Sequence, residues 1–143
     1  MGFTLLNPKS VHPTVGYSHA ARIGDLIFVS GQVSKNESDE IVGVGDAERQ
    51  TEIVYENLKR VLEESESGLD MIGKTTVFTT SLEHRPAINR VRERIFGPIG
   101  RYPASTFVVV SGLAVPEWLV EIEVIAIVRK SRCLVPAFDG LDL

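Results

Sequence analysis

The order of apolar and polar residues predicts two amphipathic helices. Across residues 46–66, apolar or small side chains recur every three or four positions and leave charged side chains between them. Asp46 is a suitable N-cap after a glycine-containing turn, and Gly68 suits a left-handed C-terminal stop. A second helix is predicted to begin at Pro86, which the first helical position tolerates, and to end at residues 97–98, a Gly-Pro pair.

Short segments rich in β-branched and aromatic residues predict strands on both sides of these helices. They are residues 3–6, 20–23, 26–30, 72–81, 105–111 and 119–128. Residues 24–25, Gly-Asp, form a two-residue hairpin turn between the second and third strands. The resulting order predicts an α+β fold, in which two helices cover one face of a single sheet.

The last predicted strand, residues 119–128, indicates what covers the face of the sheet that the helices leave open. Side chains alternate along a strand, so one side of this segment is wholly apolar, while the other combines Glu121 and Glu123 with Ile125 and Ile127. Both sides are too apolar to lie open to water. We therefore predict that the helices cover one side and that a second copy of the chain covers the other.

Length and composition predict one globular domain. The chain has 143 residues, 43% of them hydrophobic and 24% charged, with a formal net charge of −4. An acidic balance disfavours nucleic acid as a partner, and no apolar stretch reaches the roughly 20 residues of a membrane span. The N-terminal residues do not resemble a signal peptide, and the single cysteine, Cys133, favours a reducing compartment. We expect a cytoplasmic protein of one domain, 1–143, with a core at about 16–128 and a C-terminal tail at 131–143.

Four segments carry a resemblance to a known family. Residues 17–32, 70–78, 103–106 and 120–126 resemble, in order and spacing, the signatures of the Rid (reactive intermediate deaminase, YjgF-type) family. The resemblance implies a chorismate-mutase-like fold and a homotrimer whose sheets form a central barrel, with small-ligand clefts between subunits. It further implies hydrolysis of enamines and imines to 2-oxo acids and ammonia, without a cofactor.

The resemblance also implies which residues line the cleft. The matching positions are Tyr17, Gly31, Asn89, Ser105 and Glu121. Ser105 stands where the family carries an arginine that holds the substrate carboxylate, and a serine hydroxyl cannot supply that two-pronged geometry. This departure favours a substrate other than the usual amino-acid-derived imines. Thr106 offers a further hydroxyl, and Arg101, four residues before Ser105, is a candidate for reaching a carboxylate from a loop.

Glu121 is the residue best suited to chemistry. Hydration of a C=N bond needs a group that accepts a proton from water and returns it to nitrogen, and burial beside Leu119 and Ile125 would raise the pKa of Glu121 toward a useful range. The alternative is a structural carboxylate bonded to neighbouring backbone or a hydroxyl.

Other functions compete with hydrolysis. The three histidines are scattered without metal-ligand spacing, so no metal site is predicted. No cofactor is expected, because the family resemblance implies none. Loss of the arginine also allows a non-catalytic small-molecule binder or regulator. An endoribonuclease or translation inhibitor fits the acidic balance poorly.

Overall fold

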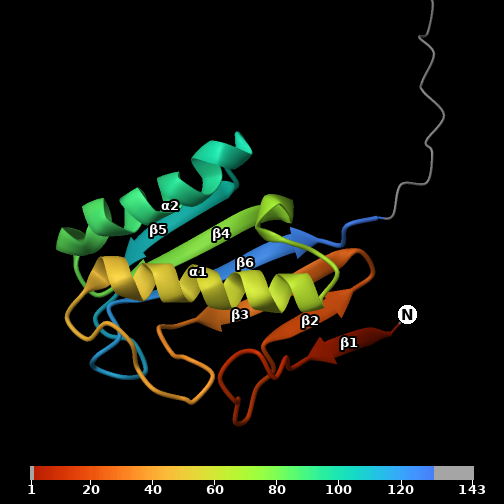
Figure 1. Cartoon of the computed structure of the whole chain (residues 1–143), viewed down its shortest axis with the longest axis horizontal. Coiled ribbons are helices and arrows are strands. Elements are labelled where there is room, and N and C mark those ends of the chain that lie inside the picture. Colours follow the sequence, from red (N-terminus) through yellow and green to blue (C-terminus); the bar gives the residue numbers. More distant parts are fainter. Residues whose placement is uncertain (1, 131–143) are drawn as a thin grey trace, which may run out of the picture.

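The computed structural model describes residues 2–130 and contains a six-stranded sheet with two long helices on one face (Figure 1). The elements are β1 (Phe3–Leu6), β2 (Ala20–Ile23), β3 (Leu26–Gln32), α1 (Ala47–Glu64), β4 (Ile72–Thr79), α2 (Arg85–Ile99), β5 (Ala104–Val109) and β6 (Val120–Ile127), with 3-10 turns at Leu69–Met71 and Leu82–His84. The predicted α+β arrangement is confirmed. The predicted tail, 131–143, lies outside the described residues.

The strands lie in the order β1-β2-β3-β6-β4-β5. β4 and β5 are parallel and joined through α2, whereas the other neighbours pair antiparallel. β6, the last strand in the chain, therefore lies between β3 and β4, and β5 forms one edge of the sheet. The predicted two-residue turn at 24–25 is confirmed, because β2 ends at Ile23 and β3 begins at Leu26. Gly24 takes a φ of 60° in this turn.

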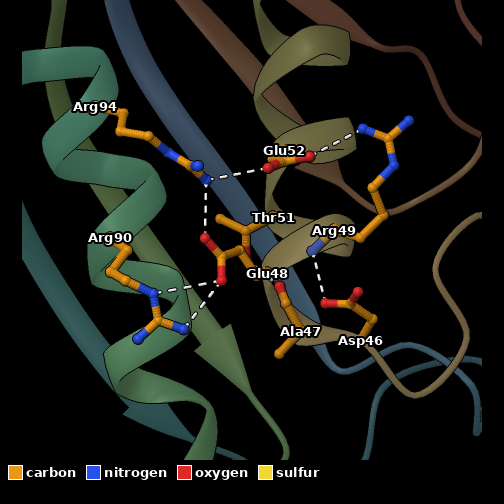
Figure 2. A network of polar contacts seen from close by, with 8 residues as sticks. All are labelled: Asp46, Ala47, Glu48, Arg49, Thr51, Glu52, Arg90 and Arg94. Atoms are coloured by element: carbon orange, nitrogen blue, oxygen red, sulfur yellow. Dashed lines mark hydrogen bonds and ion pairs between the residues drawn. The ribbon is translucent and has the colours of Figure 1, made fainter.

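Helix α1 begins as predicted and ends before the predicted glycine. The Asp46 carboxylate accepts a hydrogen bond from the Arg49 backbone N–H at 2.9 Å (Figure 2). At the other end, Ser67 N–H donates to the Leu62 carbonyl at 2.8 Å, which is the six-to-one bond of a Schellman motif. Glu66 takes the left-handed conformation of that motif with a φ of 60°. The stop predicted at Gly68 is wrong, since Gly68 is extended with a φ of −176°.

Helix α2 runs past the pair predicted to end it. Pro98 lies in the last turn, and Gly100, with a φ of 72°, is the left-handed cap. Gly100 N–H donates to the Phe96 carbonyl at 2.9 Å and so closes the helix. The predicted end at 97–98 is wrong because Gly100, rather than Gly97, adopts the conformation that breaks the helix.

The core lies between the two helices and the covered face of the sheet. Its fully buried members come from α1, α2, β3, β4 and β6 and include Ile27, Val54, Leu58, Val61, Leu62, Val77, Ile88, Val120 and Ile122. The alternation predicted for β6 is confirmed, because its even-numbered residues are buried in this core. Burial on this side fixes the register of β6 and thereby places Glu121 and Glu123 on the other side.

The second face of the sheet carries large apolar side chains that a single chain leaves uncovered. Leu26 pairs with Ile127 and Phe28 with Ile125 across β3 and β6, and these four side chains are 36–46% exposed. Glu121 and Glu123 lie on the same side. We call this surface the open face; it is the one on which the sequence predicts a second copy.

Candidate functional site

Glu121 and Gly31 lie in contact on neighbouring strands. Glu121 is the second residue of β6, and a register shift in β3 between Val29 and Gln32 places Gly31 beside it. A Cβ at position 31 would collide with Glu121 Oε1 and would lie 2.8 Å from Cδ and 2.9 Å from Cγ of the same side chain. The missing side chain of Gly31 thus makes the space in which the Glu121 carboxylate lies.

The surroundings of Glu121 favour its protonated form. Burial raises the pKa of the Glu121 carboxyl above its ordinary value, and the charge of Glu123, two residues along the same face, adds to the rise. The direction of this shift agrees with the sequence prediction. A carboxyl group whose pKa moves toward neutrality can accept and return a proton near physiological pH.

Tyr17 lies on the same side as Glu121. It is 49% exposed, and its ring contacts His19 edge-on at a centroid distance of 6.2 Å. Burial raises the pKa of the Tyr17 hydroxyl, the charge of Lys35 opposes the rise, and the charge of Glu121 adds to it. Tyr17 also lines a cavity of about 620 Å³ together with Ser30 and Glu123. We call Tyr17, Gly31 and Glu121 the acidic half-site.

Asn89 and Ser105 lie elsewhere, at the β5 edge of the sheet. Ser105 and Val124 both pair with Thr75, so all three side chains are on the helix-covered face. Glu121, an odd number of residues from Val124, is on the open face. One chain therefore does not bring Ser105 and Glu121 together, and the cleft that the sequence predicts for them lies between subunits.

Arg92 is the residue that the sequence prediction missed. Its Nη2 donates to Ser105 Oγ at 2.7 Å, and its Nη1 donates to Asn89 Oδ1 at 3.4 Å. The spacing of three residues between Asn89 and Arg92 on one helix was the available signal. We call Asn89, Arg92 and Ser105 the edge half-site.

The remaining predicted residues lie away from the edge half-site. Thr106, next to Ser105 in β5, points to the opposite face, where its hydroxyl accepts a hydrogen bond from Lys74 Nζ at 2.6 Å. Arg101 is exposed, and its charge acts on Asp70. The hydrogen bond from Arg129 is the main cause that lowers the pKa of Asp70, and Arg101 adds to it.

Two of the histidines, His12 and His19, are in contact although they are seven residues apart in the sequence. The rings of His12 and His19 are buried and lie 4.7 Å apart. His19 Nε2 donates to the His12 carbonyl at 2.7 Å, and its Nδ1 accepts from Gln32 Nε2 at 3.1 Å. This polar cluster connects the segment before β2, which carries Tyr17, to the strand that carries Gly31.

Comparison with known proteins assigns the chain to a family. Residues 7–128 match the family model described as endoribonuclease L-PSP. A RutC family protein of Pyrococcus abyssi is 39% identical over 125 residues, which are 87% of this chain and 93% of the relative. The chain belongs to the Rid family. The sequence resemblance is thereby confirmed, and the match covers both half-sites.

Two further similar proteins have names that state an activity or a bound ligand. The 3-aminoacrylate deaminase RutC of Acinetobacter baylyi is 34% identical over 114 residues, 80% of this chain and 88% of the relative. The crystal structure of E. coli TdcF with bound serine has a TM-score of 0.80 and 28% identity, and covers 87% of this chain and 98% of that chain. In residues 2–130 of the present chain, no helix is both long and apolar enough to cross a membrane.

Proposed function

We propose that this Rid-family protein hydrolyses the C=N bond of a small imine, or of an enamine after tautomerisation, and releases ammonia. The observation that carries the proposal is the position of Glu121, a half-buried carboxyl group that lies against Gly31 and close enough to Tyr17 for its charge to raise the pKa of the Tyr17 hydroxyl. The raised pKa of Glu121 supports a role in proton transfer. The deaminase name of the Acinetobacter baylyi relative supports the reaction class.

In the proposed mechanism, Glu121 exchanges one proton between water and substrate. The Glu121 carboxylate accepts a proton from water while the water oxygen bonds to the imine carbon and the C=N π electrons move to nitrogen. The proton is returned to nitrogen, which gives a carbinolamine. As that intermediate collapses, the hydroxyl proton passes to nitrogen, the C=O bond forms, and the C–N bond breaks with its electron pair leaving on ammonia. One water is consumed for each ketone or aldehyde formed.

A homotrimer is part of the proposal, because the two half-sites lie on opposite faces of one chain's sheet. The exposed apolar residues of the open face favour burial against another copy. A cyclic arrangement would place the β5 edge of one subunit beside the open face of the next. Each cleft would then combine the acidic half-site of one subunit with the edge half-site of its neighbour.

The test measures ammonia release from a panel of imines and enamines that are generated in situ in the assay mixture. Glu121→Gln should reduce the rate by about a hundredfold to ten-thousandfold, the range expected when a general acid–base group is lost. Glu123→Gln is the matched control, because it removes a carboxylate from the same face without touching Gly31, and it should change the rate far less. Equal activity of Glu121→Gln and the wild type would refute the role of Glu121. Ligand-induced thermal stabilisation without turnover of any substrate would instead support a non-catalytic binder.

A further inference from the structure

A bulge in β3 places Gly31 beside Glu121 and turns the next side chain, that of Gln32, toward the core. The register of β3 against β6 shifts between Val29 and Gln32. The Gln32 side chain is fully buried, and its Nε2 donates to the Ser30 carbonyl at 3.1 Å. This bond spans Gly31, so it fixes the shape of the bulge on which the contact between Gly31 and Glu121 depends.

The same amide nitrogen reaches His19, in the segment before β2. Gln32 Nε2 donates to His19 Nδ1 at 3.1 Å, and His19 Nε2 donates to the His12 carbonyl at 2.7 Å. Carbonyl oxygens only accept, so those of Ser30 and His12, at the two ends of this chain of bonds, fix the direction of each donor between them. Gln32 Oε1 is buried and has no partner within residues 2–130. The amide is therefore held by its N–H groups, and the two side chains form one directed link.

The other end of this link supports Tyr17. The Tyr17 ring packs edge-on against the His19 ring at a centroid distance of 6.2 Å. Two bonds attach the backbone here to β3, from Ser30 N–H to the His19 carbonyl at 2.9 Å and from Ser30 Oγ to the Ser18 carbonyl at 2.6 Å. Those bonds fix the backbone, whereas the orientation of the Tyr17 ring depends on the His19 ring beside it. Gly31 and Tyr17, which flank Glu121, are thus supported by one pair of buried side chains.

We propose that Gln32 and His19 are positioning residues that hold Gly31 and Tyr17 in place around Glu121. The inference rests on the proposed function and adds two residues to it. Neither is a catalytic residue, because the exposed fraction is 0% for Gln32 and 1% for His19, and neither lines the cavity that Tyr17 lines. They act through geometry, and a displacement of a reacting group by about 1 Å can lower a rate by about a hundredfold.

Steady-state ammonia release by the full chain, from the imine of the panel that it hydrolyses fastest, tests the inference. Gln32→Met replaces the amide with an apolar side chain of similar length, so kcat should fall by about tenfold to a hundredfold. KM should change by less than about threefold, because no contact with substrate is lost. His19→Leu should cause a similar fall. His19→Gln should stay within about fivefold of the wild type, since its amide supplies one donor and one acceptor, as the imidazole does.

Ser67→Ala is the control that separates positioning from loss of stability. Ser67 Oγ donates to the Ile127 carbonyl at 2.7 Å, at the other end of β6. Loss of this bond should lower the thermal unfolding temperature but change kcat by less than about twofold. If Gln32→Met does not yield folded protein, the comparison of His19→Leu with His19→Gln tests the same bond from its other end.

The outcomes distinguish this inference from the proposed function. Wild-type kcat in folded Gln32→Met and His19→Leu would overturn the inference and leave the proposed function standing. A fall in kcat that is as large in His19→Gln as in His19→Leu, or as large in Ser67→Ala as in Gln32→Met, would also overturn it. Absence of ammonia release by the wild type from every imine and enamine would instead refute the proposed function, and the inference with it.

Discussion

Substitution of Gly31 by alanine tests the contact on which the acidic half-site depends. The φ of Gly31 lies outside the left-handed region, so alanine is compatible with the backbone. The three heavy atoms nearest to the new Cβ all belong to the Glu121 side chain, with Cδ at 2.8 Å and Cγ at 2.9 Å. The methyl group can therefore be accommodated only if the Glu121 side chain moves.

The expected cost follows from this overlap. Inserting a methyl group into a packed site costs about 1–3 kcal/mol. Because the three nearest atoms all belong to Glu121, most of that cost should disappear in the Glu121→Ala background, where Cγ, Cδ and the carboxylate oxygens are absent. The displaced carboxylate should also lower the rate of ammonia release toward that of Glu121→Gln.

A double-mutant cycle measures this coupling. Urea denaturation of the wild type, Gly31→Ala, Glu121→Ala and the double variant, all at one subunit concentration, should give a coupling free energy of about 1 kcal/mol or more. Gly73→Ala is the matched control in β4, since its Cβ would meet nothing closer than the Ile125 carbonyl at 3.9 Å, and it should show no coupling to Glu121→Ala. A Gly31→Ala cost of the same size in both backgrounds would refute the reasoning.

Two further predictions concern stability and assembly. Burial and the Glu123 charge raise the pKa of Glu121, so its contribution to stability is lost as pH rises through the folded-state pKa. Glu121→Gln should therefore raise the thermal unfolding temperature relative to the wild type near pH 7, and the gain should vanish below pH 4.5, the ordinary pKa of the group; a gain that persists in acid would contradict this. Ile127→Glu should shift the sedimenting species toward a monomer at micromolar concentration, because it places a charge on the apolar open face. Val44→Glu, at an exposed position in the turn before α1, should not.

The periodicity of the sequence predicted the elements well because burial on one side of each element is a strong constraint. β6 shows this most clearly, since its buried even-numbered residues match the alternation of the sequence. The helix ends were predicted less accurately. They depend on which single residue adopts a left-handed backbone. Glu66 does so in place of the predicted Gly68, and Gly100 does so beyond the Gly-Pro pair at 97–98 that was predicted to end the second helix.

The sequence predicted part of the candidate site. It did not predict the orientation of Ser105 or the position of Arg92, for physical reasons. Family signatures located Glu121, Gly31 and Tyr17, which the fold does bring together. The opposite orientation of Ser105 follows from strand register, which the sequence alone does not display. Arg92 escaped notice because a charged residue on an amphipathic helix is normally solvated, and only its hydrogen bond to Ser105 distinguishes it from its neighbours.

Complementation between two inactive variants tests most directly the claim that neighbouring copies join the two half-sites. Glu121→Gln and Arg92→Gln, each strongly impaired alone at substrate concentrations well below KM, would be co-expressed at equal levels and assayed for ammonia release. In a cyclic trimer, random mixing leaves about a quarter of the clefts with both residues intact, so the account predicts about a quarter of wild-type activity. Activity no higher than the average of the two parent variants would contradict it.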